Sequence, residues 1–445
     1  MIYVYPIIHS LDVDTLEYAE RVAIHVSDSG TITQVEYLDA GSEVEVGREG
    51  EEVVYANDDE FLVPGLVDTH AHAPQFTNIG YGFNLELLDW LNEVTFPTEA
   101  SYRDAAIAEA DFKRVVDATL SVGTTTCSYY SSLHLDATKI LARVCHSRGQ
   151  RALVGKVNMD SNSPDYYRDA SAEESLQQTI EYVEYVRNTL QSTLVHPVIT
   201  PRFAICCSSE LLHKLGQYIQ QQDVHVQTHL SENKGEIDFT MSLYPDDASY
   251  THIYANRGIL TSKSILAHCC HLSKQEVELV RQFNSGISHC PTSNFNLRSG
   301  ITDVNELLSN GLHKIGLGSD CSGGYEVGIL QSLRTASTAS KALSIMHSTP
   351  SYLSLDRLFY LATLGGARVL SLDNTIGNFR VGKQFDALVI NPYTAANKTL
   401  FQSVKPVNAQ REHKTHKLQR DFERWLFAGT SANIQKVFVD GKQVV

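Results

Sequence analysis

The sequence predicts an α/β fold in which a (β/α)₈ TIM-like barrel is accompanied by a small composite β-sandwich. Two observations support this prediction. Between residues 61 and 375, eight short apolar runs alternate with longer segments of helical periodicity, which favours parallel βα units. The flanking segments, residues 1–60 and 376–445, are β-like, and we expect them to pair beside the barrel. A doubly wound sheet is the alternative for the alternating region.

The N-terminal segment contains the runs YVYPII, RVAIHVSD and TITQVEYL, which are typical of strands joined in hairpins. The C-terminal segment contains FDALVINP and closes on IQKVFVDGKQVV, where Asp-Gly indicates another hairpin. Between these two stretches, residues 394–424 are polar and locally basic and predict a helical insertion. Its HKTH, residues 413–416, is more typical of a solvated helix or loop than of a metal-binding pair.

The eight apolar runs of the barrel region are FLVPGLVDTH, GTTTCSYY, RALVGKVNM, VHPVITPRF, VHVQTHL, SILAHC, GISHC and KIGLGSD. Helical periodicity follows in segments such as YRDAAIAEADFKRVVDATLSVG, SSELLHKLGQYIQQ and SKQEVELVRQF. His70, His229, His268 and Asp320 stand where four of these runs end. A parallel barrel assembles its active site at that end of its strands, so we expect these four residues to meet.

Composition and charge exclude several classes of function. The chain carries 36 Lys and Arg against 52 Asp and Glu, a formal net charge of −16, which disfavours nucleic acid and anionic membranes as partners. A small neutral substrate is easier to reconcile with this charge. The eight cysteines form no CxxC and read as reduced thiols of a cytoplasmic protein. We find neither a signal peptide nor a window approaching the ~20 apolar residues of a membrane span.

A metal-binding group is the most specific prediction. His70 and His72 alternate with Ala71 in a strand, so both side chains point to one face and are able to close on one ion. His229 and Asp320 complete a set of three histidines and one carboxylate, which suits zinc or another first-row divalent ion. A catalytic site keeps one coordination position for water. His268 is expected to hydrogen-bond that water rather than to bind the metal directly.

Two carboxylates are expected to move protons at this site. Glu232 follows His229 by three residues in HLSE and reaches a substrate beside the metal, although a capping glutamate is the plain structural alternative. Asp320, which touches both metal and water, accepts a proton from water whose pKa the metal lowers. The reaction class is therefore hydrolysis at a polarised carbon, with Glu232, Asp320 and His268 as the catalytic residues.

The motifs PGLVDTHAHAPQF, WLNEVTFPTE, VITPRFAICCSS, HLSEN, AHC, HCPTSN, IGLGSD and LATLGGAR resemble those of the guanine deaminases, a branch of the amidohydrolase superfamily. The resemblance extends from about residue 61 to residue 445. It implies one Zn²⁺ per subunit, conversion of guanine to xanthine and ammonia in purine catabolism, and a homodimer. It also implies that Gln75, Arg202 and Phe203 hold the base together with Glu232, and that Arg202 donates to the O6 carbonyl.

Two alternatives stay open from the sequence. An amidohydrolase acting on another purine, a triazine or a pyrimidine would keep every metal residue and differ at Gln75 and Arg202. A non-catalytic scaffold is the alternative from another class, and the complete set of metal-centre residues disfavours it. Cys270 and Cys321 depart from the small residues expected beside the site, which affects the pocket shape rather than the metal. No lysine stands at the strand end of Arg202, which favours one metal over two.

Overall fold

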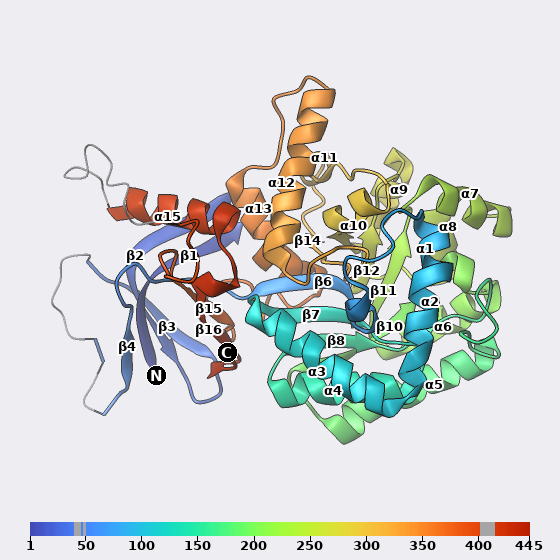
Figure 1. Cartoon of the computed structure of the whole chain (residues 1–445), viewed down its shortest axis with the longest axis horizontal. Coiled ribbons are helices and arrows are strands. Elements are labelled where there is room, and N and C mark those ends of the chain that lie inside the picture. The colour runs from blue at the N-terminus through green and yellow to red at the C-terminus, as the bar shows by residue number, and fades with distance from the viewer. Residues whose placement is uncertain (40–45, 48–49, 401–413) are drawn as a thin grey trace.

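The computed structural model describes residues 1–39, 46–47, 50–400 and 414–445, and it divides into two units (Figure 1). A mixed β-sheet built from both ends of the chain lies at the left of the view, and a barrel surrounded by helices lies at the right. The chain passes between them at Gly65, whose N–H donates to the carbonyl of Asp386, while the next residue, Leu66, donates to Gly123 in the barrel unit.

The mixed sheet has the strand order β17-β16-β15-β5-β1-β2-β3, with β4 paired to β1. Its strands are β1 Ile2–Asp12, β2 Thr15–Val26, β3 Ile32–Tyr37, β4 Val53–Tyr55, β5 Phe61–Pro64, β15 Ala387–Ile390, β16 Ile434–Val439 and β17 Lys442–Gln443. The two ends of the chain therefore share one composite β unit, as predicted. Strand β5 belongs to this sheet, so the run FLVPGLVDTH is divided between the two units and the barrel begins with the following strand.

The mixed sheet curls around its own apolar core. Strands β1 and β16 are separated by β5 and β15 in the sheet, yet the rings of Tyr3 and Phe438 have centroids 5.3 Å apart. Phe385 fills the space beside them and stacks on Tyr3 at 4.6 Å. Side chains from distant strands thus pack face to face, as the two layers of the predicted β-sandwich would.

Eight parallel strands form a nearly closed barrel in the order β14-β13-β12-β11-β10-β8-β7-β6. They are β6 Leu66–His72, β7 Thr124–Tyr130, β8 Arg151–Gly155, β10 Val195–Pro201, β11 His225–Leu230, β12 Ser264–His268, β13 Gly286–His289 and β14 Ile315–Leu317, and the short β9 Val157–Asn158 extends the pairing with β10. Between the first and last strands, the N–H of Asp320 donates to the carbonyl of His70 at 2.9 Å. The barrel prediction is confirmed, and the doubly wound alternative is wrong.

Helices surround the barrel and connect its strands (Figure 1). They are α3 Ala105–Ser121, α4 Leu135–Arg148, α5 Ala172–Glu184, α6 Ser209–Gln222, α7 Lys234–Leu243, α8 Tyr250–Asn256, α9 Lys274–Gln282, α10 Pro291–Asn296, α11 Val304–Ser309, α12 Ile329–Met346, α13 Leu355–Tyr360 and α14 Gly366–Val369. Their starts carry recognisable signals: Ser208 caps α6, and Asn233 and Ser273 form capping boxes with Glu236 and Glu276 at α7 and α9.

One further helical segment, made of α1, a π-helical turn and α2, covers the C-terminal rim of the barrel. Helices α1 Leu87–Trp90 and α2 Phe96–Ala100 are joined without a break by a π-helical turn at Leu91–Thr95. Such turns shift the helix face by an extra residue and are frequent at functional sites. Residues at both ends of this segment reach the candidate site described below.

The predicted insertion contains α15 Lys414–Ala428, which lies along the mixed sheet. The helix is amphipathic: Phe422, Trp425 and Leu426 are buried, and Phe422 contacts Phe61 of β5. Of the HKTH sequence, His413 lies outside the described residues and His416 is exposed on this helix. The helix is therefore solvated on one face only and anchored to the fold on the other.

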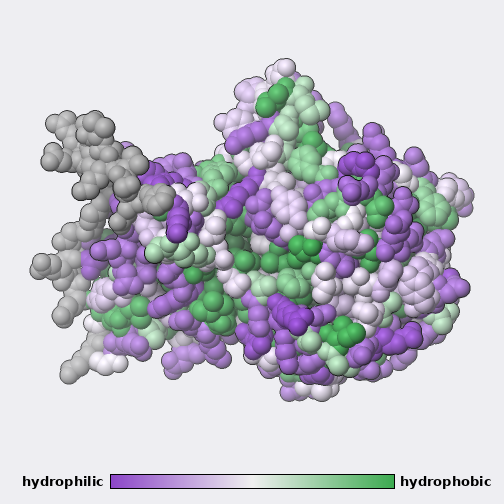
Figure 2. Space-filling model, viewed as in Figure 1, coloured by the Kyte–Doolittle hydropathy of each residue, from purple (hydrophilic) through white to green (hydrophobic). Residues whose placement is uncertain are grey.

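The surface of the described residues is mostly hydrophilic on the face shown in Figure 2, with apolar residues at the projecting end of α12, where Ile345 and Met346 are exposed. None of the helices in the described ranges is both long and apolar enough to cross a bilayer. All eight cysteines fall within these ranges; none is in a disulfide, and seven are buried.

Candidate active site

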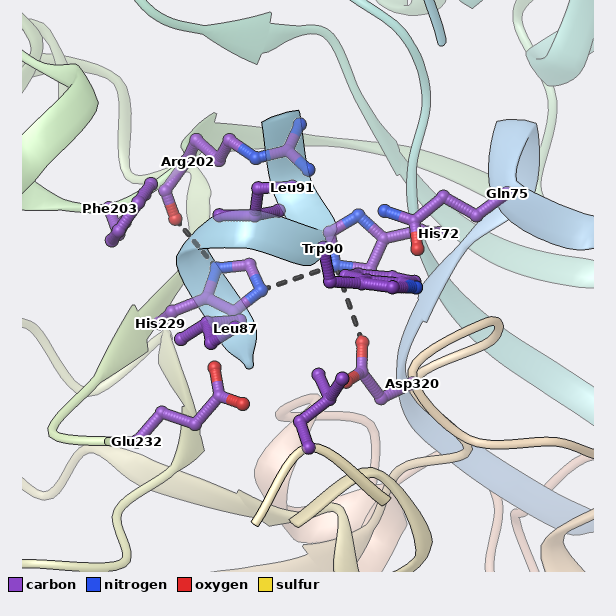
Figure 3. Close-up of a pocket in the computed structure, with 11 residues that line it drawn as sticks. His72, Gln75, Leu87, Trp90, Leu91, Arg202, Phe203, His229, Glu232 and Asp320 are labelled. Carbon is purple, nitrogen blue, oxygen red and sulfur yellow. Dashed lines mark hydrogen bonds and ion pairs between the residues drawn. The ribbon is translucent and has the colours of Figure 1, made fainter. Parts of the chain in front are cut away.

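Four predicted ligands converge at the C-terminal rim of the barrel. His70 and His72 come from β6, His229 from β11 and Asp320 from the residues after β14. One possible ligand atom of each residue, a ring nitrogen of a histidine or a carboxylate oxygen of Asp320, lies within 4.8 Å of those of the other three. The Nε2 atoms of His72 and His229 are 3.2 Å apart, and Oδ1 of Asp320 lies 3.2 Å from His70 Nε2. Figure 3 shows His72, His229 and Asp320 around this common space.

Neighbouring groups set the tautomers of two of these histidines. His70 donates Nδ1–H to Gln227 Oε1 at 2.8 Å, and His229 donates Nδ1–H to the carbonyl of Arg202 at 2.6 Å. Each Nε2 is then left with a lone pair directed at the common space. Among the described residues, none gives His70 Nε2 a hydrogen bond of acceptable geometry although the atom is buried. A buried lone pair without a donor is the condition that a metal cation satisfies, so the residues fit a metal ion.

The charge states at the site agree with metal binding. Burial and the neighbouring histidines hold the pKa of His72 and of His229 well below the usual range, so both rings are neutral, as ligands must be. Burial alone would raise the pKa of Asp320, but the neighbouring His70, His268 and His72 rings outweigh it and hold that pKa well below its usual value. The site therefore offers the neutral rings of His72 and His229 and the ionised carboxylate of Asp320 beside the lone pair of His70 Nε2.

A second set of possible ligands shares part of this site. His70, His268 and Cys290 also bring three ligand atoms close together. Burial raises the pKa of the Cys290 thiol well above its usual value, so the thiol stays protonated. Because the thiolate is the ligand form of cysteine, the set with Asp320 is the better metal site.

Glu232 and His268 lie beside the ligands, as expected from the sequence. Glu232 Oε2 is 3.4 Å from His268 Nε2, and Glu232 Oε1 accepts a hydrogen bond from Ser299 at 2.9 Å. Burial raises the pKa of Glu232, which favours its protonated form. The pKa of His268 is also raised, because attraction to Glu232 and Asp320 outweighs the opposing effect of burial. The pair can therefore hold and pass a proton.

Asp68 supports the metal ligands and was missed by sequence reasoning. It is fully buried, and its carboxylate accepts from the N–H of His70, the N–H of Ser319 and the hydroxyl of Ser319. Burial raises the pKa of Asp68 to about 7. These contacts tie β6 to the loop that carries Asp320. The available signal was spacing, since residues 68, 70 and 72 lie on the same face of the strand.

The predicted substrate residues line one pocket that opens onto the ligands (Figure 3). Gln75, Arg202 and Phe203 contribute to it, together with Glu232, and an apolar cover is made by Leu87, Trp90, Leu91 and Leu297. The cavity volume is ≈ 30 Å³, which is room for about two water molecules. Neither of the two unusual cysteines is among the residues that line this pocket: Cys321 is buried and follows Asp320 in the sequence, and Cys270 is partly exposed.

Arg202 and Gln75 share a partner that sequence reasoning also missed. Glu99, in α2, forms a two-pronged ion pair with Arg202 at 2.7 and 3.1 Å and accepts from Gln75 Nε2 at 2.8 Å. Tyr167 donates a further hydrogen bond to Glu99. The motif WLNEVTFPTE contains Glu99 but gives no indication of which residue it meets, because Arg202 lies 103 positions further along the chain.

The fold and the ligand group define a class of protein: barrel hydrolases that carry a metal-binding group at the C-terminal rim. The chain belongs to the amidohydrolase family, whose model matches residues 61–444. It is 39% identical to guanine deaminase of Dictyostelium discoideum, over 98% of this chain and 96% of that protein. It is 42% identical to the probable guanine deaminase of Schizosaccharomyces pombe, over 86% of this chain and 71% of that protein.

Solved structures agree with these relatives. The crystal structure of guanine deaminase from C. acetobutylicum with bound guanine in the active site matches 100% of this chain and 99% of that chain. The TM-score is 0.89 at 33% sequence identity. The resemblance to the guanine deaminases that the motifs predict is therefore confirmed.

Proposed function

We propose that this chain is a zinc-dependent hydrolase that converts guanine and water to xanthine and ammonia, as a step in purine breakdown. The observation that carries the proposal is the shared pocket. The ligand group of His72, His229 and Asp320, the proton-holding Glu232 and the donors of Arg202 all line the same cavity. The named activity of the relatives supports the choice of guanine.

His70, His72, His229 and Asp320 would hold the metal, one ion per subunit. Three imidazole nitrogens and a carboxylate are ligands that zinc accepts, and they leave room for one more ligand. A bound zinc ion would supply water whose pKa is lowered from 15.7 toward ~7, which makes a nucleophile available at neutral pH. The fixed tautomers of His70 and His229 orient their lone pairs before any ion arrives.

The chain's own carboxylates move the protons. Asp320 accepts the proton of the attacking water, and His268 Nε2, 3.8 Å from Asp320 Oδ2, orients that water. Glu232 delivers its carboxyl proton to a ring nitrogen of the purine while the oxygen of the attacking water bonds to C2. Asp320 then passes the proton it took from the water to the C2 amine, the C2–N bond breaks and ammonia leaves, and the proton of the new C2 hydroxyl returns to Glu232 as the C2 carbonyl forms. The raised pKa of Glu232 suits this role, because the carboxyl group must be protonated at neutral pH to act as an acid.

The opposite side of the pocket recognises the base. Arginine has only donors, so Arg202 pairs with the O6 carbonyl of guanine and leaves a buried donor unpaired against the amine of adenine. Gln75 contributes one amide that both donates and accepts, and Phe203 supplies an apolar surface. Leu87, Trp90 and Leu91 add a further apolar surface to the pocket.

The proposal extends to the state of the protein in the cell. We propose a location in the cytoplasm, which rests on the eight cysteines being free thiols, and a homodimer, which rests on the resemblance to the guanine deaminases. Light scattering on the purified protein tests this part separately, and a monomeric mass would contradict it without affecting the chemistry.

Product analysis tests the proposed reaction. Purified protein is incubated with guanine, adenine, cytosine and a triazine, and released ammonia is measured together with the ultraviolet spectrum of the product. We expect guanine to be converted to xanthine at least about 100-fold faster than adenine, the scale of discrimination that buried hydrogen-bond mismatches give. Equal rates on adenine or cytosine would contradict the assignment of Arg202 and Gln75.

A further inference from the structure

Glu99 takes no part in the chemistry proposed above, yet it lies directly behind the base-binding side of the pocket. Its side chain is fully buried in α2. An ionised carboxylate at such a depth is strongly destabilising unless it is paired and its remaining lone pairs are satisfied. The identity and arrangement of its partners therefore show what the residue does.

Four hydrogen bonds fill the acceptor positions of the Glu99 carboxylate. Oε2 accepts from Arg202 Nη1 at 2.7 Å and from the Tyr167 hydroxyl at 2.8 Å. Oε1 accepts from Arg202 Nη2 at 3.1 Å and from Gln75 Nε2 at 2.8 Å. Since a carboxylate has about four lone-pair sites, none is left for a substrate. Glu99 is thus closed to the pocket and faces two side chains that line it.

The bonds to Glu99 decide what Arg202 and Gln75 present to a ligand. A guanidinium has five N–H donors, and Glu99 takes two of them, so three remain in a fixed plane. The Gln75 amide is held from both ends, because its Oε1 also accepts from the N–H of Ser322 at 3.2 Å. Figure 3 shows Arg202 and Gln75 on one side of His72 and His229, and Glu232 on the other.

We propose that Glu99 is a positioning residue for substrate recognition: it locks Arg202 and Gln75 in the orientation that binds the carbonyl edge of the base. The proposal rests on the function proposed above. Removing the Glu99 carboxylate leaves the proposed metal ligands and Glu232 in place. We therefore expect the change to weaken substrate binding, which raises KM, and to leave the chemical step, measured by kcat, nearly unchanged.

A matched control exists elsewhere in the chain. Arg151 and Asp386 also form a two-pronged buried pair, at 3.0 and 3.1 Å, and neither residue lines the pocket. If Glu99 were a structural partner only, Glu99→Gln and Asp386→Asn would lower the thermal midpoint alike and leave KM unchanged. If Glu99 is a positioning residue, KM for guanine rises in Glu99→Gln and stays unchanged in Asp386→Asn.

The test uses the zinc-loaded enzyme with guanine as substrate, in the wild type, Glu99→Gln, Arg202→Ala, the double variant and Asp386→Asn. Zinc content and thermal midpoint are measured in the same samples. We expect Glu99→Gln to raise KM by about 10- to 100-fold, the range for a lost charged hydrogen bond, with kcat within about 3-fold of the wild type. In the Arg202→Ala background, Glu99→Gln should raise KM by a smaller factor than it does in the wild-type background, since only Gln75 is then left for Glu99 to position.

The outcomes are distinct. If the wild type is active and KM is unchanged in Glu99→Gln, the positioning role is overturned and the proposed function stands. The same holds if the effects of Glu99→Gln and Arg202→Ala on KM are additive in the double variant. A wild type that releases no ammonia from guanine overturns both. If Glu99→Gln does not fold, Glu99→Asp keeps the charge but shortens the side chain by one methylene, and KM should again rise while zinc is retained; an unchanged KM overturns the proposal.

Discussion

Arg151 and Arg202 both make two-pronged ion pairs in the interior, but they lie at opposite ends of neighbouring strands. Arg151 is the first residue of β8, and its partner Asp386 comes from the mixed sheet. Arg202 follows the last residue of β10, and its partner Glu99 comes from the helix above the rim. The first pair joins two units of the fold, whereas Arg202 of the second pair lines the candidate pocket.

The contrast shows that position along a barrel strand, rather than side-chain chemistry, decides what a buried ion pair does. A buried ion pair at the N-terminal rim of a barrel stabilises the fold, whereas one at the C-terminal rim can form part of a site. Strand β11 shows the same contrast in one element. His225 at its first residue donates to the carbonyl of Leu370, while His229 near its end offers a lone pair to the proposed metal.

The largest effect at the C-terminal rim is expected for Asp320→Ala. This change removes a proposed metal ligand and the acceptor for the water proton. We expect turnover of guanine to fall by about 10⁴-fold or more, the upper range for general acid–base catalysis, and zinc content to fall well below one ion per chain. Steady-state rates and metal analysis of the same preparation check this. Full zinc occupancy in the variant would argue against ligation by Asp320.

Glu232→Gln is expected to separate the proton shuttle from the metal. The amide keeps the shape of the side chain but cannot carry the proton, so kcat should fall by about 10²–10⁴-fold. Zinc content and thermal midpoint should match the wild type. Ser299→Ala, which removes only the hydrogen bond to Glu232 Oε1, serves as the milder control. Normal turnover by the glutamine variant would make Glu232 a structural cap instead.

Asp386→Asn sharpens the comparison from the other rim. Among the residues that the structure describes, Asp440, 3.8 Å away, is then the acidic group that pairs with the buried Arg151 guanidinium. Breaking a buried pair in this way typically costs about 3–5 kcal/mol of unfolding free energy. Denaturant unfolding should show that loss while KM for guanine stays unchanged. A raised KM for guanine in this variant would contradict the claim that the Arg151–Asp386 pair affects stability and not substrate binding.

A smaller, pH-dependent effect is expected at His225. Burial and the neighbouring His196 lower its pKa to about 4, with Lys263 and Lys314 acting in the same direction. The unfolded chain, with an ordinary pKa of 6.5, binds more protons in this range, so stability falls as the pH falls from about 6.5 to 4. The loss by pH 5 is up to about 2 kcal/mol. Replacing His225 with Gln should flatten this part of the stability curve measured by thermal unfolding; an unchanged slope would contradict the assignment.

The sequence predicted the parts of the site that repeat with a strand or follow a strand end. His70 and His72 share a face because side chains alternate, and His229, His268 and Asp320 end their runs, so the barrel fold alone brings them together. The composite β unit was predictable for a similar reason, since both chain ends carry hairpin signals. These features depend on local periodicity and on one global topology.

The features that sequence reasoning missed depend on contacts between distant segments. Glu99 meets Arg202 only because the helix of α1 and α2 crosses the rim, and no spacing encodes that meeting. Gly65, where the run FLVPGLVDTH passes from one unit to the other, lies against a distant segment, because a Cβ at this position would lie 2.1 Å from the Thr125 side chain. The curling of the mixed sheet likewise becomes visible only when Tyr3 is seen against Phe438.

The central claim is that one zinc ion, held by His70, His72, His229 and Asp320, serves a pocket that deaminates guanine. The most direct measurement quantifies metal and product in one sample of purified wild-type protein incubated with guanine. The account predicts close to one zinc ion per chain, with xanthine and ammonia formed in equal amounts, and loss of both products after chelation with recovery on adding zinc. Protein that forms no xanthine when loaded with zinc, or that forms it at full rate without any metal, would contradict the account.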